Sequence, residues 1–142
     1  MSVSPGHSVH VPIPFDALSK TQPHWLPFVQ RIGERSRCGV KQHLDEIASG
    51  QVQIHLAWDR AEKRARALAG TEIHLRGADR IGVLVWCTGS MRELWFPLLN
   101  DIERYMREYH GCAGIRAIAR PGWSKLLKQN GYRLTHVVME KD

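Results

Sequence analysis

Apolar side chains in the first third of the chain recur at the three- and four-residue spacing of one helix face. The repeat runs from Trp25 to Ile47 and is interrupted near Cys38-Gly39. The pattern therefore predicts two consecutive helices with a break between them. Ser49-Gly50 is the predicted end of the second helix, because glycine commonly follows the last helical turn.

The residues before these helices are rich in proline, at positions 5, 12, 14 and 23. This stretch is predicted to form an extended arm, because proline interrupts helices and cannot donate a hydrogen bond to a sheet. Only Val9, Val11 and Ile13 alternate with their neighbours as a strand requires, so we expect a short first strand there. The predicted organisation is an N-terminal arm over residues 1–8 and a single domain over residues 9–142.

Three strands are predicted between residues 51 and 87. In "QVQIHLAWD" (51–59) the apolar residues alternate with polar ones, which is typical of a half-buried strand. The stretch "ARALAGTEIHLRG" (65–77) alternates in the same way after a charged turn, so we expect an antiparallel partner. The apolar run "IGVLVWC" from Ile81 to Cys87 is continuous, which favours a central strand covered on both faces.

A long amphipathic helix is predicted next, because apolar residues recur at helical spacing from Leu98 to Tyr109 and the pattern ends near Gly111. Pro97 fits the first turn of a helix better than its interior. We therefore expect the helix to begin near Phe96 and residues 88–95 to form an irregular loop.

Three short elements are predicted after the long helix. A strand is expected at Gly114–Ala119, then a short helix in "PGWSKLLKQNG" and a last strand in "YRLTHVVME". In that last segment Leu134, His136 and Val138 alternate with their neighbours as in a strand packed into a sheet. The mixture of helices and strands predicts an α/β class, specifically an α+β fold with a mixed sheet.

Composition and charge narrow the class of partner. The formal net charge is +6, but the basic residues are spread along the chain, which argues against a nucleic-acid partner. Three cysteines without CxxC spacing argue against disulfides and a cysteine zinc site, so we expect a reducing cytoplasm. His7 and His10 have no nearby carboxylate or thiol to complete a metal site, and we expect no metal. No run approaches the roughly 18 apolar residues of a membrane span.

The order of these predicted elements resembles the GNAT superfamily of N-acetyltransferases. In that family the chain forms, in this order, a strand, two helices, a three-strand meander, a long helix, a strand, a short helix and a strand. The ending "LLKQNGY" followed by "THVVMEK" is similar to the Gly-aromatic pair and strand that close many members. The likeness covers about Val9 to Lys141 and is closest to short phage-encoded members.

The resemblance implies a site for acetyl-CoA or another acyl-CoA. In that family two parallel strands, here Ile81–Cys87 and Gly114–Ala119, separate and hold the pantetheine arm between them. The backbone of Trp86, Cys87 and Thr88 would bond to that arm. The pyrophosphate would lie at Gly89, Ser90, Met91 and Arg92, near the N-terminus of the long helix. This chain has "CTGSMREL" where the family has a Gln/Arg-x-x-Gly-x-Gly/Ala loop.

The resemblance also implies a general acid and a general base, for which this sequence offers several candidates. A tyrosine often stands four residues before the glycine of the Gly-aromatic pair, and this chain has Leu127 there. The candidate acid is Tyr132, whose alternative role is a core or rim aromatic. The candidate base is Glu72 or His74, whose alternative roles are an exposed surface carboxylate and a surface histidine. Cys87 is either a nucleophile or a small buried thiol.

Two main hypotheses follow. The first is an N-acyltransferase that transfers an acyl group from acyl-CoA to an amine acceptor by direct attack. The second is a non-catalytic protein of the same fold, such as a phage or virion-associated binding protein with a protein partner. Leu127 and the altered phosphate loop favour the second hypothesis. A nucleic-acid-binding module is a third and weaker alternative that rests on net charge alone.

Overall fold

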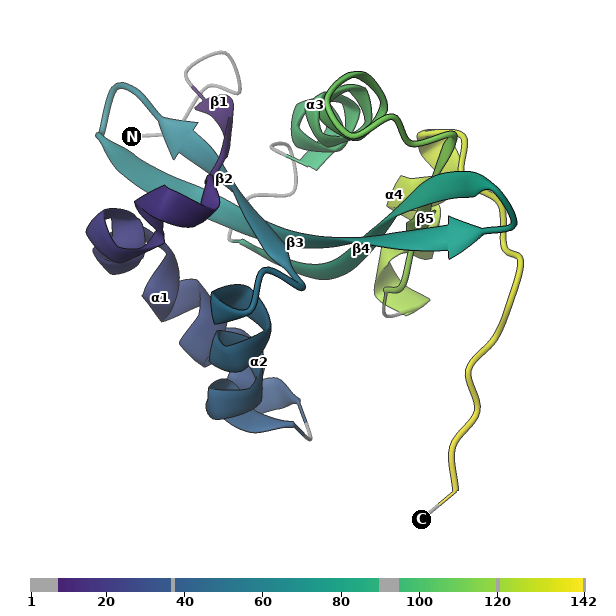
Figure 1. Ribbon diagram of the computed structural model, residues 1–142, viewed down its shortest axis with the longest axis horizontal. Coiled ribbons are helices and arrows are strands. Elements are labelled where there is room, and N and C mark those ends of the chain that lie inside the picture. Colours follow the sequence, from purple (N-terminus) through teal and green to yellow (C-terminus); the bar gives the residue numbers. More distant parts are fainter. Residues whose placement is uncertain (1–7, 37, 90–94, 120, 142) are drawn as a thin grey trace.

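A computed structural model describes residues 8–36, 38–89, 95–119 and 121–141. Its centre is a five-stranded sheet in the order β1-β2-β3-β4-β5. Helices α1 and α2 cover one face of the sheet, and α3 covers the other (Figure 1). The predicted α+β fold with a mixed sheet is confirmed. Residues 1–7 of the predicted arm, and Ser90, Met91 and Arg92 of the predicted phosphate loop, lie outside the described residues.

Four strands pair antiparallel with their neighbours along the chain. They are β1 (Ser8–Pro12), β2 (Gln53–Asp59), β3 (Arg64–Arg76) and β4 (Asp79–Gly89). The fifth strand, β5 (Gly114–Ala117), runs parallel to β4. The predicted meander and the parallel pair are both confirmed, because a chain that crosses over a helix returns in the same direction.

The first helix begins earlier than the sequence predicts, whereas the break before the second helix lies where it is expected. A 3-10 turn, η2 (Phe15–Ala17), leads into α1 (Leu18–Arg35), which is followed by α2 (Gly39–Ala48). The predicted extended arm through position 23 is therefore wrong, because Pro23 and Pro27 both lie inside α1. The two prolines are four residues apart and both are exposed. They share one solvent-facing side of the helix, where carbonyl groups deprived of an N–H partner can bond to water.

Each face of the sheet has its own apolar core. Leu98, Leu99, Ile102 and Met106 of α3 (Trp95–Glu108) pack on small alanines and Leu84 of the sheet. Trp25, Val29 and Ile47 of α1 and α2 pack on the opposite face. The two layers explain why β4 is buried along most of its length, as its continuous apolar run predicts.

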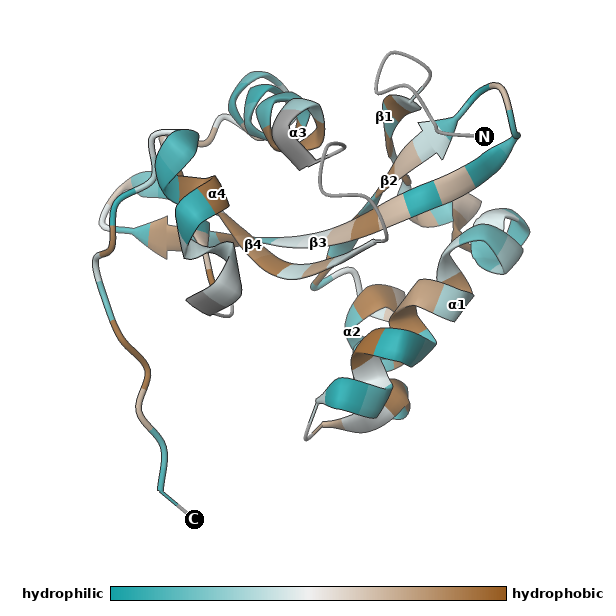
Figure 2. Ribbon diagram, turned by 180° about the vertical axis from the view of Figure 1, so that it is seen from behind, coloured by the Kyte–Doolittle hydropathy of each residue, from teal (hydrophilic) through white to brown (hydrophobic). Residues whose placement is uncertain are grey.

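The predicted last strand is wrong. After the 3-10 turn η4 (Pro121–Trp123) and α4 (Ser124–Gln129), residues 133–141 form neither helix nor strand and leave the body of the molecule as an extended tail (Figure 1). Leu134, Val138 and Met139 are 74%, 77% and 88% exposed. Figure 2 shows a hydrophobic stretch, in brown, along the tail and away from the rest of the molecule.

The physical reason lies at the base of the tail. The backbone N–H of Tyr132 donates to Leu127 O at 3.0 Å, and its hydroxyl donates to Glu103 on α3 at 2.7 Å. These bonds hold the chain against α3 as it leaves α4. Alternation makes a segment suitable for a strand, but a strand also has to lie beside a sheet edge, and this tail does not pair with β5, the last strand of the sheet.

Candidate functional site

Strands β4 and β5 separate in the middle of β4. They pair from Ile81–Gly114 to Leu84–Ala117, and the N–H of Ile118 donates to Leu84 O at 2.9 Å. Trp86 pairs with Gly70 of β3 and Leu84 pairs with Thr71, so Val85 is an extra residue in β4. Such a bulge bends the strand that carries it. The bulge thus coincides with the point where β4 leaves β5, and β4 continues to Gly89 paired with β3 on its other side.

The side chain of Trp86 points away from this gap, into the core beneath α1 and α2. It is 9% exposed and packs against the edge of the His43 ring, with the ring centres 4.8 Å apart. A Cβ on Gly70 would lie 2.6 Å from the indole ring, so the glycine is needed for this contact. The backbone of Trp86 therefore lies at the gap between β4 and β5, while its side chain stabilises the fold.

Cys87 packs on the α3 side with Trp123 and Leu127. Burial raises the pKa of the Cys87 thiol to about 12. A thiol with that pKa keeps its proton at neutral pH, and only the thiolate is a strong nucleophile. Of the two roles considered for Cys87, the structure favours the small buried thiol.

Thr88 and Gly89 complete the described part of the predicted cofactor segment. Thr88 is buried, and a Cβ on Gly89 would lie 2.7 Å from Cβ of Ala67 on β3. The predicted loop over residues 88–95 therefore begins two residues later, because Thr88 and Gly89 still belong to β4. The absence of a side chain at Gly89 serves strand packing.

Tyr132 lies beside the same apolar cluster, held by its hydrogen bond to the Glu103 carboxylate. Burial and the neighbouring Glu103 carboxylate raise the pKa of the Tyr132 hydroxyl well above its usual value. The phenol is therefore protonated across the physiological range. Nothing in the local sequence identifies Glu103 as the partner, because it lies on α3, far from Tyr132 along the chain.

Glu72 lies on the opposite face of the sheet from Tyr132. The preceding residue, Thr71, points toward α3, where its hydroxyl contacts His55, and successive strand residues point to opposite faces. The Glu72 carboxylate accepts a hydrogen bond from Gln51 at 3.2 Å and pairs with His74 at 2.8 Å. The structure therefore does not bring the two candidate proton-transferring residues together.

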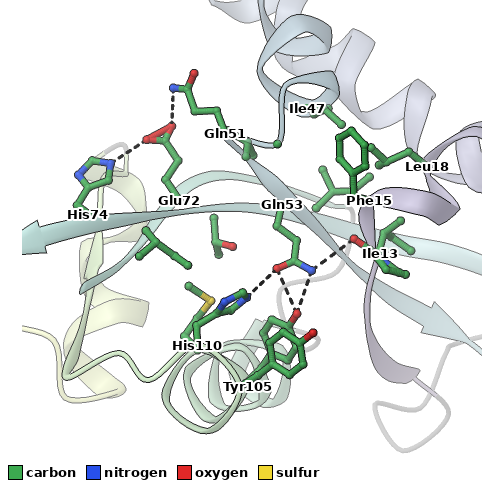
Figure 3. Close-up of a pocket in the computed structure, with 18 residues that line it drawn as sticks. Ile13, Phe15, Leu18, Ile47, Gln51, Gln53, Glu72, His74, Tyr105 and His110 are labelled. Atoms are coloured by element: carbon green, nitrogen blue, oxygen red, sulfur yellow. Dashed lines mark hydrogen bonds and ion pairs between the residues drawn. The ribbon is translucent and has the colours of Figure 1, made fainter. Parts of the chain in front are cut away.

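Glu72 instead lines a cavity of about 650 Å³ beside the beginning of β2 and the middle of β3 (Figure 3). The first residues of α1, the end of α2 and the last turn of α3 complete the walls. None of the lining residues belongs to β4 or β5. The cavity and the gap at Val85 are thus separate features, and sequence analysis missed the cavity because its walls come from distant segments.

A buried polar network lies beneath α3. His55 is fully buried, with one ring nitrogen 2.8 Å from His10 and the other 2.8 Å from Thr71. The Tyr105 ring of α3 packs edge-on against both imidazoles. Burial, and then the nearby His10 and His110, lower the pKa of His55 well below its usual value. The sequence pattern placed His55 on a polar face, whereas α3 covers that face.

Comparisons with known proteins agree on the fold. No protein-family model matches the sequence, and no curated protein matches it significantly. Aminoglycoside N-acetyltransferase AAC(6')-Iy in complex with CoA is 14% identical, with a TM-score of 0.71 over 96% of this chain and 94% of that chain. An acetyltransferase of Trypanosoma brucei is 14% identical, with a TM-score of 0.66 over 95% and 99%.

Glucosamine-6-phosphate N-acetyltransferase from Arabidopsis thaliana is 12% identical, with a TM-score of 0.66 over 95% of this chain and 97% of that chain. Identities this low show a shared fold and no more. Within the described residues, no helix is both long and apolar enough to cross a bilayer. The chain thus has the fold of the GNAT N-acetyltransferases, with the mixed sheet and the parallel β4–β5 pair that its element order predicts.

Proposed function

We propose that this protein binds acyl-CoA between β4 and β5 and transfers the acyl group to an amine. The observation that carries the proposal is the separation of the parallel strands at the Val85 bulge. Beyond Leu84, the β5-facing edge of β4 has no strand partner among the described residues. Backbone polar groups on such an edge need partners, and the amides of a pantetheine arm can supply them.

The fold supports the choice of ligand, because one neighbour of the same fold was solved with CoA. In this proposal the backbone of Trp86, Cys87 and Thr88 holds the arm, and Gly89 to Arg92 hold the phosphates. The N-terminus of α3 follows directly, and free N–H groups at a helix N-terminus favour an anion. Bound acyl-CoA supplies an activated thioester at this gap.

The proton that the departing thiolate needs is assigned to Tyr132. Its hydroxyl is protonated and donates to Glu103, and burial together with this contact raises its pKa, which weakens it as an acid. The Tyr132 N–H donates to Leu127, which packs on the same apolar cluster as Cys87 of β4. General-acid catalysis requires a proton donor near the leaving atom, and Tyr132 is the phenol assigned to that role.

Acetyl-CoA is expected to raise the melting temperature of the purified protein. A ligand that binds only the folded state stabilises it by about 2.7 kcal/mol at 100 times its dissociation constant. For a chain of this size that corresponds to an upward shift of about 5–10 °C in thermal unfolding. ADP at the same concentration is the control for non-specific phosphate binding. An unchanged melting curve in millimolar acetyl-CoA would contradict the proposal.

A second candidate function is binding without catalysis, as in a phage or virion-associated protein that retains the fold. The observation favouring it is chemical: after Asp79, the described part of β4 carries no carboxylate, and the Cys87 thiol stays protonated. Acetyl-CoA binding without acetylation of any amine in a broad panel would support this candidate. Turnover with any amine would exclude it.

A further inference from the structure

The cavity beside β3 has an unusual charge balance. Of the residues that line it, Glu72 carries the one formal negative charge, and neither lysine nor arginine is among the described lining residues. The Glu72 side chain is 15% exposed. A carboxylate that is largely removed from water is stabilised by a cation. The described walls of this cavity provide it with the imidazole of His74, at 2.8 Å from Glu72, and with no lysine or arginine.

The Glu72 carboxylate also has unused hydrogen-bonding capacity. An ionised carboxylate offers about four lone-pair positions. One oxygen accepts from the Gln51 amide and the other contacts His74. Two positions therefore remain for donors from a ligand, and an ammonium group carries up to three donors.

The wall across from Glu72 is apolar and aromatic. Figure 3 shows Ile13, Phe15 and Leu18 at one end of the cavity and Glu72 with Gln51 at the other. Phe15 is 66% exposed, so its ring is available at the edge of the cavity. Such a wall suits a hydrocarbon or aromatic group, because removing apolar surface from water is favourable.

The floor of the cavity is already formed. The Gln53 amide donates to Tyr105 at 3.0 Å, and its carbonyl oxygen lies 3.2 Å from His110. These bonds join β2 to the last turn of α3. A volume of about 650 Å³ lies within the range of small-molecule sites, which are mostly apolar with a few fixed polar groups.

We propose that this cavity binds a small organic amine with an aromatic or branched aliphatic body. The ammonium group is held by the Glu72 carboxylate, and the body lies against Phe15 and Leu18. This assigns Glu72 to ligand recognition, as an alternative to the role of general base. The proposal does not depend on acyl transfer, because the cavity walls contain no residue of β4 or β5.

The test uses 2-phenylethylamine as the probe and 2-phenylethanol as its neutral counterpart, by isothermal titration at pH 7.5 without acyl-CoA. The amine is expected to bind at least tenfold more tightly than the alcohol. Amide chemical-shift changes should be concentrated at Glu72, Gln53 and Tyr105. Because acyl-CoA is omitted, failure of the transferase proposal cannot produce a negative result here.

Two variants and a control complete the experiment. Glu72→Gln is expected to weaken amine binding about tenfold, since a charged hydrogen-bond partner is lost. Glu34→Gln removes the same charge from an exposed site on α1 and should leave the affinity unchanged. Phe15→Ala should weaken binding several-fold and fold normally, because Phe15 is exposed, so it decides the question if Glu72→Gln does not fold.

Three results would overturn the proposal. The first is equal affinity for the amine and the alcohol, and the second is undiminished amine binding in Glu72→Gln and Phe15→Ala. The third is a set of shift changes centred on Val85 and Trp86, which would place the amine at the gap between β4 and β5.

Discussion

Replacing Gly33 with alanine should destabilise the protein by about 1–3 kcal/mol, the usual cost of forcing an extra methyl group into a packed core. A glycine-to-alanine change inside a helix normally stabilises it by up to about 1 kcal/mol, so the expected sign is reversed. Gly33 is buried where α1 meets α2, and a Cβ there would lie 2.7 Å from Cα and 2.8 Å from N of Val40. Backbone atoms cannot rotate aside as a flexible side chain can, so the two helices must move apart.

Urea unfolding of the variant beside the wild type provides the measurement. Gly122→Ala is the matched control, because a Cβ there has no neighbouring atom within 4 Å. The control should unfold at the wild-type urea concentration. A Gly33→Ala protein as stable as wild type, or more stable, would show that α1 and α2 are not packed as closely as described.

Acidification should weaken the fold through His55. An unfolded histidine accepts a proton near pH 6.5, whereas the pKa of His55 in the folded state is well below that value because the ring is buried and close to His10 and His110. Below pH 6.5 the unfolded chain therefore binds a proton that the folded chain does not. The stability is present above pH 6.5 and is lost as the pH falls toward the folded-state pKa.

Each such proton lowers the free energy of unfolding by up to about 1.4 kcal/mol per pH unit. Urea unfolding at intervals from pH 8 to pH 5 should show this slope in the wild type. His55→Gln should be less stable at pH 8, because His10 and Thr71 lose a partner. Its free energy of unfolding should, however, fall less steeply as the pH is lowered, because up to one proton fewer is taken up on unfolding. His136→Gln, in the exposed tail, should keep the wild-type slope, and equal slopes in all three proteins would refute the role of His55.

The parts of the fold that local sequence predicts are those whose partners are also local. The alternation in residues 51–77 predicts two antiparallel strands, and β2 and β3 pair across a short turn. The helical spacing after Pro97 predicts α3, whose apolar face packs on the sheet. In both cases one periodic pattern contains the information needed to bury the correct face.

The parts that sequence reasoning missed depend on distant contacts. Pro23 and Pro27 argue locally against a helix, but α1 gains enough from burying Trp25 and Val29 to retain both prolines on its exposed side. The tail alternates like a strand, yet its direction is set by the bond from Tyr132 to Glu103. The same holds for the candidate sites, because Glu72 acquires its surroundings from α1, α2 and α3 together.

The tail has a practical consequence for the experiments described above. Beyond Tyr132, which is hydrogen-bonded to Glu103 on α3, the chain runs outward, away from the sheet (Figure 1). A fluorophore, an affinity tag or a sensor-chip linkage attached after Lys141 would be carried clear of both the gap at Val85 and the cavity at Glu72. The molecule thus has a built-in spacer at its C-terminal end, by which it can be immobilised with both candidate sites left open to ligand.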